Sequence, residues 1–245
     1  IDDMIDNEDQ LKLIEYLNEW INKKINEDLK NLIDLKNTKE TNTSIRALAY
    51  QLYENNGVIK REKVINFIKF LKQDERKILR AMGVKFGRYH IFLHRLFKPN
   101  AVSLRILLWK NFHQKYFVLE PPKFGLNFFE DKKNINPNFM LICGFEKFDK
   151  YYVRIDILER LFLKIIDSNQ NEKKEIQLNS EMLNLLGCNK SDFIKLIQKM
   201  GYKTFAKDND LYFKYSPNKK IKKQFISKKN DNDNPFSVLT ELNFK

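Results

Sequence analysis

The side chains that could do chemistry include three histidines: His90 and His94 are four residues apart, and His113 follows. On a helix, a pair with this spacing can hold a metal ion. The composition around the pair favours a strand or a turn, where the two side chains lie far apart, and no carboxylate or thiol is close in sequence. We therefore expect no metal site, and a histidine that is hydrogen-bonded near the core or lies against phosphate.

Nucleotide chemistry would need a phosphate-binding loop and a carboxylate for magnesium. The seven glycines nowhere form GxxxxGK[ST], so the sequence predicts no such loop. The run from Asp74 to Lys77 (DERK) imitates the start of a DExH box, but it lies between helical segments, and we interpret it as a helix N-terminus. No nucleophile and base form a local signature, and Cys143 and Cys188 are far apart, so we predict no catalytic residues, no metal and no cofactor.

A basic and aromatic run at 83–99, GVKFGRYHIFLHRLFKP, is the stronger functional signal. Binding of a single strand needs cations that follow the phosphates and flat side chains that stack on bases. The alternative is that the aromatic residues belong to the core and the cations only solvate its surface, and for Phe86, Ile91, Phe92 and Leu93 we favour it. The nucleic-acid-binding residues predicted in and near this run are Lys85, Arg88, Tyr89, His90, Arg95, Lys98 and Arg105.

The distribution of charge supports this interpretation. Residues 60–115 hold 15 Lys and Arg against 3 Asp and Glu, so this stretch supplies +12 where the whole chain has a net charge of +13. A local field of one sign attracts polyanions and accelerates their association. No apolar run approaches the ~18 residues that a membrane span needs, so we expect no membrane partner. Two distant cysteines without a CxxC motif fit a reducing cytoplasm, where we expect the protein.

Helical periodicity dominates the first half of the chain. It predicts one long amphipathic helix over 11–35, and further helices over 45–55, 61–72, 74–82 and 101–112. Thr43 or Ser44 is the expected N-cap of the second helix. We divide the chain into a helical domain at 1–118, which includes the basic aromatic segment, and an irregular connecting loop at 119–150.

The second half shows the order α-β-α-α-β-β. Helices are expected over 155–166, 181–186 and 191–200, and short strands over 176–178, 202–206 and 211–215. This is the order of a winged helix, so we predict a winged-helix-like domain at 151–216. The last helix adds Lys190, Lys195 and Lys199 to the predicted nucleic-acid-binding set. The predicted fold class is therefore mainly α with small β elements (α+β).

A flexible basic tail is expected over 217–245. Its lysines Lys219, Lys220, Lys222 and Lys223 complete the predicted nucleic-acid-binding set. Phe236, Leu239 and Leu242 have a spacing of three and predict a short segment that docks on the body of the protein or on a partner.

Three segments resemble a known family: MGVKFGRYHIFLHRLFKP, then RIDILERL with LNLLGCNKSDFIKLIQKMGYK, and the terminal NPFSVLTEL. From about Leu11 to Leu242 the chain resembles the C-terminal third of alphaproteobacterial DExH-box helicases, superfamily-two relatives of the mitochondrial degradosome RNA helicase. The family pattern has proline where His94 stands. The resemblance implies a bacterial protein that guides RNA to RecA-like motor domains on the same polypeptide. Those domains would bind ATP and Mg²⁺, and the tail could reach a degradation or ribonucleoprotein partner. The chain begins with Ile1 rather than Met, so we expect a piece of a longer protein.

Three functions remain open on the sequence. The first is an accessory region that holds single-stranded RNA, or DNA as the second choice, for a helicase motor. The second is a winged-helix protein that reads duplex DNA through the helix at 191–200, although that helix offers no arginine, the usual reader of guanine. The third is a non-catalytic adaptor for protein partners.

Overall fold

The structure is a computed structural model, and it describes residues 6–39, 42–114, 118–132, 134–168, 175–207 and 210–216. Helices dominate, and the strands form three small antiparallel sheets of three strands each within these residues. The predicted α+β class with mainly helical content is confirmed. The tail at 217–245, with its predicted binding lysines and docking segment, lies outside the described residues.

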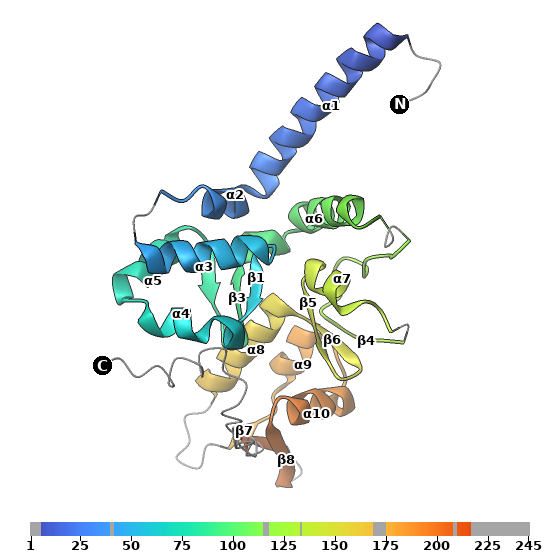
Figure 1. Ribbon diagram of the computed structural model, residues 1–245. Helices are drawn as coiled ribbons and strands as arrows, with labels where there is room; N and C mark the ends of the chain where they lie inside the picture. Colours follow the sequence, from blue (N-terminus) through green and yellow to red (C-terminus); the bar gives the residue numbers. More distant parts are fainter. Residues whose placement is uncertain are drawn as a thin grey trace, which may run out of the picture.

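The N-terminal helix α1 (Asn7–Asp28) extends away from the rest of the molecule, and none of its residues is buried (Figure 1). The sequence predicted one continuous helix over 11–35, but the chain turns at Leu29 and continues as α2 (Lys30–Lys36). The reason is packing: Leu29, Leu32 and Leu35 are buried in the first core cluster, and a straight helix would carry them away from it.

The first structural unit follows α2. Its elements are α3 (Thr43–Glu54), β1 (Val58–Lys60), a 3₁₀ turn η1 (Arg61–Val64), α4 (Ile65–Phe70), α5 (Gln73–Ala81), β2 (Val84–Phe86) and β3 (His90–Leu93). Asn42, rather than the expected Thr43 or Ser44, caps α3 by accepting hydrogen bonds from the backbone N–H groups of Ser44 and Ile45. The DERK run does lie at a helix N-terminus, where Glu75 accepts a hydrogen bond from the backbone N–H of Lys72.

The second unit corrects the predicted loop at 119–150. It comprises η2 (His94–Phe97), α6 (Pro99–Phe112), β4 (Phe128–Glu130), α7 (Pro137–Ile142), β5 (Phe145–Phe148) and β6 (Tyr151–Arg154). The elements within 119–150 are short, so they show no long periodicity, and they are held by contacts distant in sequence. Phe139 and Tyr152, for example, are fully buried in the core of this unit.

The third unit has the predicted order of elements. It contains α8 (Ile155–Asp167), β7 (Ile176–Gln177), α9 (Ser180–Leu186), α10 (Lys190–Lys199), β8 (Tyr202–Lys207) and β9 (Asp210–Tyr215). Its core includes Met182, Leu186, Phe193, Ile197 and Phe213, all of them fully buried.

The three units repeat one plan that the sequence revealed only in the last. In each unit a helix is followed by a strand, then by helix, then by a hairpin, and the hairpin's second strand lies in the middle of the sheet. The sheet orders are accordingly β1-β3-β2, β4-β6-β5 and β7-β9-β8. The first two hairpins lead directly into the next unit: β3 ends at Leu93 and η2 begins at His94, and β6 ends at Arg154 and α8 begins at Ile155. The chain is therefore a tandem array.

Candidate nucleic-acid interface

The basic aromatic run forms the hairpin of the first unit. Strand β3 is buried along its whole length, while Lys85 and Arg88 lie on strand β2 and on the turn. Two of the aromatic residues that we expected in the core contact it: Phe92 is buried, and Phe86 is partly buried against the first core cluster. Hydrophobic residues thus anchor the hairpin and direct its cations outward.

A single carboxylate from the third unit holds the turn of this hairpin. Glu159, on α8, accepts hydrogen bonds from the backbone N–H groups of Arg88, Tyr89 and His90, the last two at 2.8 Å. Gly87 permits this approach, because a Cβ at that position would lie 2.3 Å from the Glu159 carboxyl carbon. Hydrogen bonds to an ionised carboxylate are stronger than those between neutral groups. Glu159 therefore holds the hairpin turn, and with it Arg88, against α8.

The side chain of His90 also connects the hairpin to the second unit. Its Nε2 lies 3.0 Å from Glu146 Oε2 on β5, its Nδ1 lies 3.6 Å from Glu159 Oε1, and Lys60 Nζ lies 2.6 Å from Glu146 Oε1. Burial lowers the pKa of His90, but the hydrogen bond to Glu146 and the nearby carboxylate of Glu159 together raise it by more, so the net pKa is above its usual value. One buried histidine therefore joins carboxylates from two other units and favours the protonated form.

A cavity of about 520 Å³ opens between this hairpin and α8. Arg61, Lys85, Arg88 and Arg160 supply its cations, and Phe162 forms part of its apolar wall. The Arg88 guanidinium lies 5.7 Å from the centre of the Phe162 ring. Cations and aromatic faces therefore meet in one depression.

The carboxylates of this cavity are already engaged. Arg154 binds Asp156 through two hydrogen bonds of 2.7 and 2.9 Å, and Glu159 is occupied by the hairpin turn. The side chains of Lys85 and Arg160, in contrast, make no hydrogen bond or ion pair with any described part of the chain. The field in the cavity is therefore that of its cations, which suits a polyanion.

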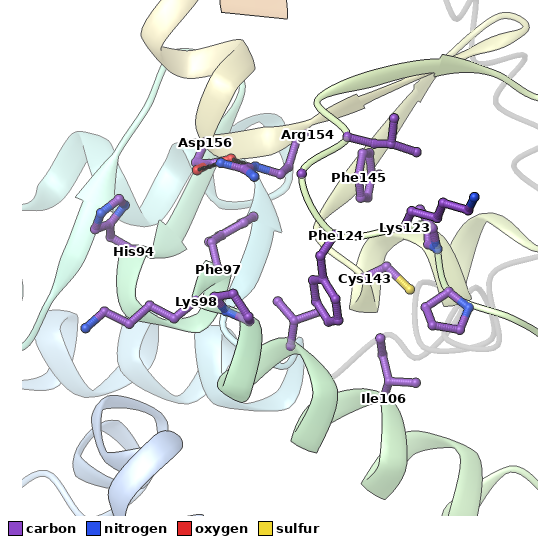
Figure 2. A pocket seen from close by; sticks show the side chains of 16 residues that line it. His94, Phe97, Lys98, Ile106, Lys123, Phe124, Cys143, Phe145, Arg154 and Asp156 are labelled. Carbon is purple, nitrogen blue, oxygen red and sulfur yellow. Dashed lines mark hydrogen bonds and ion pairs between the residues drawn. The ribbon is translucent and has the colours of Figure 1, made fainter. Parts of the chain in front are cut away.

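Two further cavities adjoin the first. A cavity of about 310 Å³ shares His94 and Asp156 with it, and another of about 340 Å³ shares Arg61 and Arg88. Figure 2 shows the cavity of about 310 Å³, in which the Arg154–Asp156 pair and Phe97 lie on one side and Phe124 and Cys143 on the other. We call the three together the basic groove.

The groove brings together part of the predicted residue set. Lys85, Arg88, Tyr89 and Lys98 line it, and the largely buried His90 borders one of its cavities, whereas Arg95 is exposed on η2 and lines none of the three. The Tyr89 ring packs edge-on against Phe162 with centroids 5.8 Å apart, and burial raises the pKa of its hydroxyl. Tyr89 therefore contributes mainly to packing between units.

Two predicted contacts need correction. His90 is 2% exposed and Arg105 is 4% exposed, so neither side chain is available at the surface to bind a nucleic acid. Arg105 lies inside α6, and burial lowers its pKa to about 10. In both cases the residue type suggested a phosphate ligand, but the strand or helix places it inward.

Helix α10 forms a separate basic surface. Lys190, Lys195 and Lys199 lie on it, as predicted, and Lys199 Nζ lies 3.2 Å from a carboxylate oxygen of the exposed Asp149. None of the three lines the basic groove.

The sequence did not indicate four residues that line the groove: Arg61, Glu159, Arg160 and Phe162. They lie on η1 and α8, and α8 is about 70 residues beyond the hairpin, so no local spacing connects them to it. The one available signal was the charged Glu159-Arg160 pair between the apolar Leu158 and Leu161.

No family model matches the chain, and no curated protein or solved structure gives a significant match. Within the described ranges, no three or more His, Cys, Asp or Glu side chains gather where they could hold a metal ion. No helix of the described part is long and apolar enough to cross a membrane.

Proposed function

We propose that this chain is a non-catalytic nucleic-acid-binding region that holds single-stranded RNA, or DNA as the second choice, for an ATP-dependent helicase motor. The observation that carries the proposal is the basic groove, where cations and aromatic rings line adjoining cavities. A single strand exposes both phosphates and base faces, and stacking of a base on an aromatic side chain is worth ~1–3 kcal/mol.

The contacts that hold the hairpin in place beneath the groove support the same proposal. Binding that orders flexible side chains costs free energy, and a site held in place before binding avoids part of this cost. Glu159 and His90 fix the hairpin against α8, and the cations project from that fixed frame. Lys85 and Arg88 are then presented together with Arg160 and Phe162.

The link to a helicase rests on the resemblance of the sequence segments. In that proposal the motor domains of the same polypeptide bind ATP and Mg²⁺ in a bacterial cytoplasm, and this region guides the strand. The tail would add electrostatic attraction through its lysines and reach a further protein partner.

A second candidate function is favoured by the third unit. Its elements have the winged-helix order, and α10 carries Lys190, Lys195 and Lys199. A helix in this position can enter the major groove of duplex DNA. This candidate predicts that duplex binds more tightly than single strands and that charges on α10 matter most.

The test compares affinities for a homopolymeric single strand and for a duplex at two salt concentrations. Reversal of both groove charges, Arg88→Glu with Lys98→Glu, should weaken single-strand binding at least tenfold, or about 1.4 kcal/mol. The slope of log affinity against log salt should shrink by about 0.7 for each phosphate that the variant no longer neutralises.

A matched control is Lys23→Glu with Lys30→Glu, which changes the net charge equally at exposed positions of α1 and α2. It should change the affinity far less than the groove reversal. An equal loss in both double variants would mean that only the total charge matters, and an unchanged slope in the groove variant would overturn the proposal. Tighter binding of duplex would favour the second candidate.

A further inference from the structure

The outer face of the third sheet has features that neither its core nor the basic groove explains. Strands β8 and β9 pair antiparallel, and Tyr202 and Phe213 on their inner face are buried in the third core. Because side chains alternate between the two faces of a strand, the outer face carries the neighbours of these residues. They are Lys203, Phe205 and Lys207 on β8, and Asp210, Tyr212 and Lys214 on β9.

Two lysines stand directly opposite each other on this face. Lys203 and Lys214 are cross-strand partners, both are exposed, and neither side-chain amine makes an ion pair or hydrogen bond within the described residues. Like charges in directly opposite positions destabilise a sheet. The pair thus opposes folding of the hairpin, and an anion bound between the two amines would remove the repulsion.

An aromatic pair occupies the next position. Phe205 and Tyr212 are cross-strand partners, half-buried, with ring centroids 6.0 Å apart and planes inclined by 18°. The Lys207 amine lies 5.9 Å from the centre of the Tyr212 ring. The acidic side chain of this face, Asp210, accepts a hydrogen bond of 2.7 Å from Gln177 on β7. Rings and cations therefore alternate along the sheet with little opposing charge.

We propose that this outer face is a second binding surface for single-stranded nucleic acid, with bases on Phe205 and Tyr212 and phosphate between Lys203 and Lys214. Flat rings on an open sheet suit unpaired bases, whose faces are free to stack, whereas duplex bases are stacked on one another. The inference extends the proposed function to a surface that shares no residue with the basic groove. It also assigns a role to the third unit other than insertion of α10 into a duplex.

The most informative variant is Lys214→Glu, because it separates folding from binding. An opposite charge facing Lys203 should raise the melting temperature by about 1–3 °C, since such pairs contribute tenths of a kcal/mol. The same change should weaken binding of oligouridylate about threefold to tenfold and reduce the salt slope by about 0.7. The charge-matched control Lys30→Glu, on α2, should leave both affinity and slope nearly unchanged. A more stable Lys214→Glu protein with full affinity and an unchanged slope would overturn the proposal.

A second variant, Phe205→Ala with Tyr212→Ala, tests stacking. It should weaken oligouridylate binding about tenfold, with the salt slope kept, because rings and not charges are removed. Circular dichroism checks that the hairpin still folds. A larger effect of either sheet variant on duplex than on single strands would contradict the proposed occupant.

Combination with the groove variant distinguishes the two proposals. If only Arg88→Glu with Lys98→Glu weakens binding, the groove stands and the sheet surface is overturned. If only the sheet variants weaken binding, the sheet surface stands and the groove is overturned. Weaker binding in both sets supports both surfaces, and a wild-type chain that binds no single strand overturns both.

Discussion

Removal of the Glu159 carboxylate should destabilise the protein more than any comparable removal of a surface charge. In Glu159→Ala, the backbone N–H groups of Arg88, Tyr89 and His90 are left without their acceptor in a largely buried place. An unsatisfied buried donor costs ~1–3 kcal/mol. The turn borders the basic groove and can admit water, so we take the low end for each donor and expect the free energy of unfolding to fall by about 3–4 kcal/mol.

Urea denaturation, followed by circular dichroism, measures this change directly. In a chain of this size it corresponds to a fall in melting temperature of about 6–16 °C. The control is Glu181→Ala, which removes an exposed carboxylate paired with Lys164 on the same unit and should cost under about 1 kcal/mol. Glu159→Gln keeps an acceptor oxygen and should lie between the two. A change below about 1 kcal/mol in Glu159→Ala would refute the role given to this carboxylate.

Three further predictions concern other parts of the chain. His90→Gln should lower the free energy of unfolding most near pH ~5.5 and least near pH ~9. The pKa of His90 is raised in the folded state, so the stabilisation by protonated His90 is complete below its unfolded pKa of ~6.5 and disappears as the pH rises through the folded pKa. Denaturation at both pH values checks this, and a pH-independent difference between variant and wild type would contradict it. The purified chain should neither bind nor hydrolyse ATP, and RNA-stimulated turnover that persists through further purification would disprove this. Deletion of residues 230–245 should lower stability, increase proteolysis or abolish capture of a partner, and no change in any of the three would contradict docking by Phe236, Leu239 and Leu242.

The sequence predicted the elements that have a clear local pattern. The α-β-α-α-β-β order after residue 154 follows from short periodic runs separated by turns, and the structure has those elements in that order, while residues 151–154 of the predicted domain belong to β6 of the second unit. The position of Glu75 at a helix N-terminus was also visible, since helix N-termini favour acidic residues. In contrast, the turn at Leu29 follows from burial of Leu32 and Leu35 against other helices, which helical periodicity does not encode.

Apart from α6, the second unit was missed because its strands are three or four residues long and its second helix has six. Such elements are stable only through tertiary packing, and propensity summed over so few residues carries little information. The repeat of one plan was hidden for the same reason, although each hairpin is preceded by a glycine with positive φ: Gly83, Gly144 and Gly201.

The residues of the candidate site also differ in whether a local sequence pattern indicates them. Lys85, Arg88 and Lys98 were found because cations and aromatic residues cluster locally, and all three line the basic groove. Arg160 and Phe162 come from a distant helix that only the fold brings close. His90 and Arg105 carried the right chemistry, but the structure buries them.

Photo-crosslinking of a 4-thiouridine-containing oligouridylate, mapped by mass spectrometry, tests most directly the claim that the basic groove holds a single strand. We expect crosslinked peptides from the hairpin around Phe86 and Arg88 and from α8 around Phe162, and we expect these crosslinks to disappear in Arg88→Glu with Lys98→Glu. Crosslinks that avoid both segments, or that persist unchanged in the groove variant, would contradict it.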